Sequence, residues 1–169
     1  MMKPCALSPS EPAMSTRWSA AACFVLLLYG ACGVALAEAR EPSPALSPTD
    51  VVRAQLVALR DDDRARGARR AFRFASPANR RTIGSAADFA AVLERGYADM
   101  FTQTRARVRL QKRDGGQARV LAELEQLDGR QSAYVFFLSQ QAGGDCEDCW
   151  MTDGVYPLEP AHDAPLYSI

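Results

Sequence analysis

The spacing of hydrophobic residues in this chain changes once, near residue 102, and this change constrains the fold more than any other feature. Before it, apolar side chains recur every three or four residues, which is typical of helices that bury one face. After it, apolar and polar side chains alternate, which is typical of strands with one buried face. The alternation is clearest where Ala106, Val108 and Leu110 lie between arginines. Helices followed by strands predict an α+β fold.

Three helices are expected in the first part of the domain. We place them at residues 49–61, 64–74 and 85–96. Thr49 or Asp50 can cap the first helix, and Ser85 can cap the third. Ser76-Pro77 should end the second helix and start a short turn, because the residue before a proline is disfavoured in a helix.

Four antiparallel strands are expected in the second part. Gly115-Gly116 and Asp128-Gly129 have the composition of hairpin turns, and Gly143-Gly144 begins a third connection. The last strand should run from Cys149 to about Leu158. The chain is therefore predicted to pack three N-terminal helices on one face of a curved four-stranded antiparallel sheet. Alternating arginines and glutamates on the first two strands are interpreted as the solvated face of that sheet.

The N-terminal region has the pattern of a secretory leader. Arg17 precedes an uncharged, mainly apolar run at residues 19–37, which ends in Ala35-Leu36-Ala37. We predict cleavage near Ala37 and export to the periplasm or the cell exterior. An uncleaved membrane anchor, an organelle presequence and a start at Met14 stay open as alternatives.

The remaining chain is expected to form one domain. A proline-rich linker should cover residues 38–48, the folded domain residues 49–158, and a C-terminal tail residues 159–169. Lys+Arg and Asp+Glu both number 20, so the net charge is zero and nucleic acid is not an expected partner. The one histidine, His162, lies in the tail. This argues against a Ser-His-Asp triad or a histidine-ligated metal inside the domain.

Cys146 and Cys149 form the sharpest local motif, a CxxC pair just before the last strand. In an oxidising compartment the two thiols should form a disulfide. A redox pair is an alternative, but Glu147 and Asp148 between them would oppose a reactive thiolate. Metal binding would need further ligands, since one CxxC pair supplies only two.

Several strings in the chain are similar, in order, to those of an uncharacterised family, domain of unknown function 4864. They are AQLVALRDDD at residues 54–63, AFRFASP at 71–77 followed by Arg80, Phe89 leading to Gly96-Tyr97, and WMTDGVYP at 150–157. The family resembles in layout the nuclear transport factor 2-like superfamily. The resemblance covers about residues 50–158 and implies a cone-shaped α+β roll with a pocket between the helices and the sheet. It implies no particular activity.

Candidate site residues follow from that implied pocket. Tyr97, Tyr134, Trp150 and Asp153 would line it, with Asp153 as a candidate general acid or base if its carboxylate points inward. The other interpretation of Asp153 is a bulge or turn formed with Gly154. The leading hypothesis is a non-enzymatic domain that binds a small molecule or a protein, without a cofactor, and that can form a homodimer through the exposed sheet face. The alternatives are a small isomerase or dehydratase and a thiol-redox protein.

Overall fold

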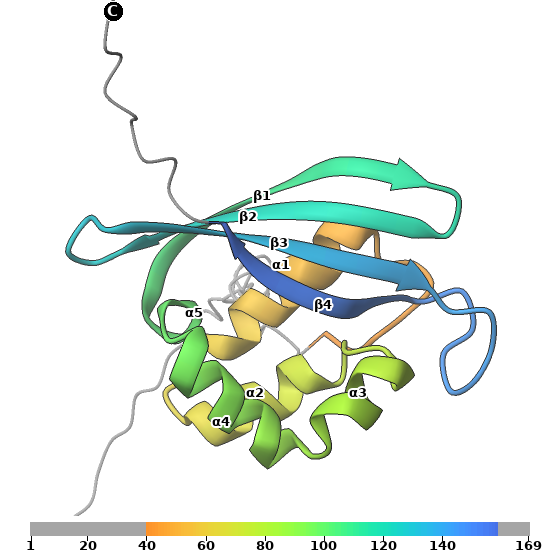
Figure 1. Cartoon of the computed structure of the whole chain (residues 1–169), viewed down its shortest axis with the longest axis horizontal. Coiled ribbons are helices and arrows are strands. Elements are labelled where there is room, and N and C mark those ends of the chain that lie inside the picture. Colours follow the sequence, from red (N-terminus) through yellow and green to blue (C-terminus); the bar gives the residue numbers. More distant parts are fainter. Residues whose placement is uncertain (1–39, 159–169) are drawn as a thin grey trace, which may run out of the picture. The chain divides into compact units, whose positions relative to one another are not determined.

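Helices occupy the first half of the folded chain and strands the second, as the change in hydrophobic spacing predicts (Figure 1). The computed structural model describes residues 40–158. Its elements are the helices α1 (Pro48–Leu59), α2 (Arg64–Phe72), α3 (Pro77–Ile83), α4 (Ala86–Gly96) and α5 (Asp99–Thr102), and the strands β1 (Gln103–Asp114), β2 (Gln117–Gln126), β3 (Gln131–Gln140) and β4 (Trp150–Leu158). The predicted leader and C-terminal tail lie outside the described residues.

Short polar side chains start the helices. Ser47 caps α1, and its hydroxyl accepts a hydrogen bond from the backbone N–H of Asp50, whose carboxylate bonds back to the cap. Ser85 and Asp88 form the same reciprocal pair at the start of α4. Asp63 caps α2 through a bond from the backbone N–H of Arg66. The sequence signals for helix starts are thus correct to within two or three residues.

The described residues contain five helices, where the sequence analysis expected three. Ser76 and Pro77 do more than end α2: the serine side chain caps a new helix, α3, and the proline occupies its first turn. The sequence analysis expected only a short turn after Pro77, and this seven-residue helix has no buried residue that would mark it by an apolar stripe. The four-residue α5 has no side-chain cap, so no local signal marks it either.

The four strands form one antiparallel sheet in the order β1-β2-β3-β4, which confirms the prediction of four antiparallel strands. Gly115 and Gly129 have positive φ angles of 53° and 82° in the first two hairpins, a conformation that glycine adopts without a steric penalty. Three register shifts interrupt the ladders: two lie in β1, after Gln103 and after Leu110, and one lies in β4 opposite Phe137–Leu138. The shift in β4 leaves Asp153 as the extra residue of a β-bulge.

The helices cover one face of the sheet (Figure 1), and the core lies between the two layers. Val51, Val52 and Leu56 on α1 are buried, and on the sheet side Val120, Phe136 and Leu138 meet them. The segment after α2 also docks on the sheet. The backbone N–H of Thr152 donates to Phe74 O at 2.8 Å, and the N–H of Ser76 donates to Thr152 O at 2.9 Å. This contact fixes α3 beside β4.

Within residues 40–158, no helix has the length and apolar character needed to cross a membrane.

Candidate functional site

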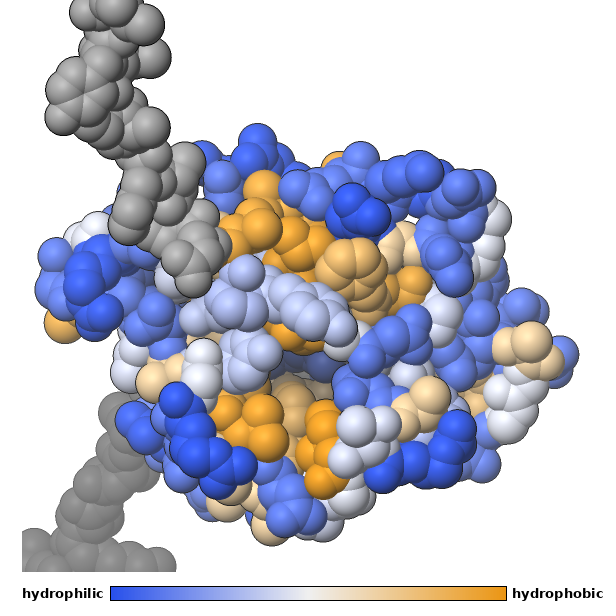
Figure 2. Space-filling model, in the orientation of Figure 1, coloured by the Kyte–Doolittle hydropathy of each residue, from blue (hydrophilic) through white to orange (hydrophobic). Residues whose placement is uncertain are grey.

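A cavity of about 400 Å³ lies between the helices and β4. Figure 2 shows a hollow in this face of the molecule with apolar side chains along its rim. Most lining side chains are apolar, and they come from all five helices and from β3 and β4. They include Leu59, Phe89, Leu93, Met100, Phe136 and Val155. The exposed lining residues include Ala78, Thr82 and Val92 from α3 and α4 and Tyr156 from β4, so these elements border the opening.

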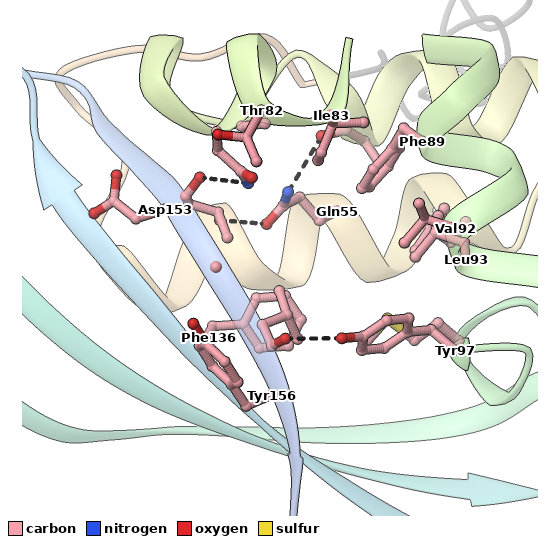
Figure 3. Close-up of a pocket in the computed structure, with 18 of the residues that line it drawn as sticks. Gln55, Thr82, Ile83, Phe89, Val92, Leu93, Tyr97, Phe136, Asp153 and Tyr156 are labelled. Atoms are coloured by element: carbon pink, nitrogen blue, oxygen red, sulfur yellow. Dashed lines mark hydrogen bonds between the residues drawn. The ribbon is translucent and has the colours of Figure 1, made fainter. Parts of the chain in front are cut away.

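Polar groups gather at the end of the cavity where α1, α3 and β4 meet (Figure 3). The hydroxyl of Thr152 donates to Gln55 Oε1 at 2.7 Å, and Gln55 Nε2 donates to Ala71 O at 3.2 Å. Asn79 Nδ2 donates to Thr152 O at 3.2 Å. Gln55 and Thr152 are 4% and 1% exposed. Buried amides and hydroxyls need such partners, and here the partners fix them facing the cavity.

Tyr97 lines the cavity from the C-terminal end of α4, as expected of a pocket residue. Its hydroxyl donates to Val155 O at 3.0 Å and so ties α4 to β4 (Figure 3). Tyr134 lies behind it, with ring centroids 5.8 Å apart, and is buried in the core rather than in the cavity lining. Burial raises the pKa of the Tyr134 hydroxyl, and the charge of Asp99 adds to the shift.

Asp153 adjoins the cavity through its backbone at the bulge, but its side chain is on the other face of the sheet. Its Oδ1 accepts a hydrogen bond from the Ser139 hydroxyl at 3.0 Å, and Figure 3 shows the carboxylate turned away from Gln55. A bulge adds one residue to a strand and so reverses the side on which that residue points. The geometry therefore matches the bulge interpretation and not an inward-facing acid.

Trp150 is a core residue. It is 3% exposed, does not line the cavity, and has the guanidinium of Arg113 5.0 Å from its ring centroid. Of the four predicted pocket residues, the structure thus brings the side chain of Tyr97 and the backbone of Asp153 to the cavity and leaves Tyr134 and Trp150 in the packed core.

Comparison with known protein families matches residues 45–164 to the domain of unknown function DUF4864. The chain belongs to this family. No curated protein and no solved structure matches it. The match covers every helix and strand described above, so the cavity of this DUF4864 chain is built entirely from its family domain.

The disulfide of this DUF4864 chain joins Cys146 and Cys149, as the CxxC motif predicts, with Cα atoms 5.5 Å apart. Cys149 is completely buried beside Trp150, and Cys146 is half-buried. The N–H of Asp148, which has a φ of 60°, donates to Gln141 O at 2.8 Å across the loop. The disulfide thus closes a tight turn just before β4, and neither of its cysteines lines the cavity.

The outer face of the DUF4864 sheet has a different chemistry. Phe137 and Tyr156 meet edge to face with centroids 5.5 Å apart, and the Arg119 guanidinium stacks on Phe137 at 5.1 Å. Arg109 pairs with Glu123 at 2.9 Å. These contacts confirm the solvated charged face. The homodimer expected through it stays a prediction.

Sequence reasoning missed the polar end of the cavity. Gln55 lies within the apolar stripe of α1, and a polar residue at a buried helical position was a usable signal. Asn79 and Thr152 gave no such signal, because their roles depend on the docking of residues 74–76 on β4. Among residues 40–158, no three His, Cys, Asp or Glu side chains come together in a way that could hold a metal ion.

Proposed function

We propose that this DUF4864 domain is a non-enzymatic module that binds a small molecule in the cavity between its helices and its sheet. The observation that carries the proposal is the size and character of the cavity: about 400 Å³, mainly apolar, with polar groups at one end. Ligand pockets have volumes of about 300–1,000 Å³ and this combination of apolar walls with a few polar groups. Ordinary packing defects in protein cores are far smaller.

The placement of titratable groups favours binding over catalysis. A general acid or base must reach the substrate within hydrogen-bond distance. Of the described residues that line the cavity, only Asp153 carries a carboxylate, and that carboxylate bonds to Ser139 on the outer face. Tyr97 directs its proton to a backbone carbonyl. These side chains serve the protein's own hydrogen bonds, so they suit a wall that positions a ligand.

The disulfide supports a role outside the cytoplasm, because such bonds persist in oxidising compartments. Export through the predicted leader is part of this proposal. The resemblance to the nuclear transport factor 2-like layout is also part of it, and that layout would place the ligand inside a cone formed by the helices and the concave sheet face. The expected partner is then a small molecule.

The experiment is a titration of the full chain with N-phenyl-1-naphthylamine, a dye that fluoresces in apolar surroundings. We expect saturable binding of one dye per chain. Ala78→Trp adds a large side chain at the opening of the cavity and should abolish the signal, because Ala78 is exposed and lines the cavity. Arg81→Trp is the matched control, since Arg81 is on the same helix, is exposed and does not line the cavity.

Loss of dye binding in Ala78→Trp alone, with unchanged thermal unfolding, supports the proposal. No saturable binding to the wild-type chain contradicts it. Equal binding by both variants also contradicts it, because the dye would then occupy another surface.

A further inference from the structure

None of the described side chains that face into the cavity carries a charge that could neutralise a charged ligand. Among the described lining residues, the only ionised side chain is Asp153, which faces the other side of the sheet. Arg80 is the cationic side chain of α3 closest in sequence to Asn79, and its guanidinium donates to the backbone carbonyls of Ala75 and Arg73. A carboxylate or ammonium group in the cavity would thus lose its hydration without gaining a counter-ion, which is costly.

The polar end offers hydrogen-bond donors that the protein does not use. Each primary amide has two N–H donors. Gln55 uses one toward Ala71 O and Asn79 uses one toward Thr152 O, and neither amide has a second acceptor within residues 40–158. The Thr152 proton is committed to Gln55 Oε1. Each of these two cavity-lining amides therefore keeps one spare N–H donor beside an otherwise mainly apolar space.

Together these features define a ligand class. We propose that the cavity selects an uncharged, mainly apolar molecule with a hydrogen-bond-accepting oxygen, such as a ketone or an ether, which binds to the amides of Gln55 and Asn79. This inference rests on the proposed function and narrows it. The apolar walls hold the body of the ligand, the amides hold its oxygen, and the absence of a counter-ion rejects acids and amines of the same shape.

Three ligands of matched shape test this selection against the full chain. They are 2-acetylnaphthalene, 2-isopropylnaphthalene and 2-naphthoate, each measured by displacement of the dye at pH 7. The ketone should bind about five- to tenfold more tightly than the hydrocarbon, since one hydrogen bond contributes about 1 kcal/mol. It should bind at least about tenfold more tightly than the carboxylate, because that ion enters without a partner.

Asn79→Leu links the selectivity to the polar end. Asn79 is half-buried, so the variant should fold. It should remove the advantage of the ketone over the hydrocarbon and leave hydrocarbon affinity within about twofold. Gln111→Leu makes the same amide-to-leucine change on an exposed residue outside the cavity and should change neither affinity. A second readout needs no variant: the side-chain amide N–H signals of Gln55 and Asn79 in NMR spectra should shift with the ketone and not with the hydrocarbon.

The outcomes separate the two proposals. If neither the dye nor any naphthalene binds, the proposed function fails. If the compounds bind but 2-naphthoate matches or exceeds the ketone, the ligand class is wrong and the binding function stands. If the ketone keeps its advantage in Asn79→Leu and shifts neither amide signal, the assignment of its oxygen to this end of the cavity is overturned.

Discussion

The two faces of the sheet differ in burial although they are formed by the same strands, and the neighbouring residues Phe136 and Phe137 show this difference. Phe136 points toward the helices, lines the cavity and is 2% exposed. Phe137 points outward, is 36% exposed and meets Tyr156 and Arg119. Because side chains alternate along a strand, one register assigns every residue to one face or the other. The comparison teaches that one sheet can form a cavity wall on one face and a solvated surface on the other.

Polar groups differ between the faces as well. On the inner face, Thr152 and Gln55 are almost fully buried and bond to each other. On the outer face, Arg109 and Glu123 pair in contact with water. An unpaired polar group costs much more when buried than when exposed. Matched substitutions on the two faces should therefore change the free energy of unfolding by unequal amounts.

The largest difference is expected between Phe136→Ala and Phe137→Ala. The first removes a buried ring from the core and should lower the free energy of unfolding by about 3–5 kcal/mol. The second removes two aromatic contacts at the surface and should cost about 1 kcal/mol. Urea unfolding of both variants measures the difference. Equal losses would contradict the assignment of faces.

A smaller difference is expected between Thr152→Val and Ser139→Ala. Valine keeps the shape of Thr152 but leaves the buried Gln55 Oε1 without its donor, which should cost about 1–3 kcal/mol. Ser139→Ala removes the outer-face bond to Asp153 and the bond that the Ser139 hydroxyl accepts from Gln141 Nε2, and the loss should stay within about 0.5 kcal/mol. Thermal unfolding distinguishes the two. A neutral Thr152→Val would mean that the polar end of the cavity is hydrated.

Tyr134 should make stability sensitive to alkaline pH. Burial raises its pKa in the folded state above the ordinary value of 10.0, so the folded state holds the proton more tightly than the unfolded state does. The resulting stabilisation is complete below about pH 10 and is lost as pH rises through the folded-state pKa. Tyr134→Phe should flatten the alkaline decline in the free energy of unfolding. The control is Tyr156→Phe, which removes the same hydroxyl from an exposed tyrosine of β4.

The smallest effect is expected for the outer ion pair. A double-mutant cycle with Arg109→Ala and Glu123→Ala should give a coupling energy of about 0.2–1 kcal/mol. The coupling should fall in about 1 M salt, where charges are screened within about 3 Å. A coupling that salt does not reduce would place this pair out of contact with water and break the contrast between the faces.

Local sequence patterns predicted the fold better than the site. The alternation after residue 102, the two glycine hairpins and the Ser85 cap each depend on neighbours in sequence, and each is confirmed. The bond between Gln55 and Thr152 joins residues 97 positions apart, and no local period encodes such a contact. The bulge at Asp153 also depends on the β3 partner. An alternation of side chains along β4 therefore could not predict the face on which the Asp153 side chain lies.

The same limit explains the misplaced aromatic residues. Trp150 and Tyr134 were correctly expected to face inward, and both belong to the core. Whether an inward side chain meets a cavity or another side chain depends on the layer that covers it. Here Tyr97 packs on Tyr134, and Arg113 stacks on Trp150. Neither neighbour can be deduced from the spacing of residues along a strand.

The most direct test is a crystal structure of the full chain with 2-acetylnaphthalene. The account predicts the naphthalene ring among Phe89, Leu93 and Phe136, with its carbonyl oxygen within hydrogen-bond distance of the Gln55 and Asn79 amides. A ligand on the outer face against Phe137 and Arg119, with the inner cavity empty, would contradict it.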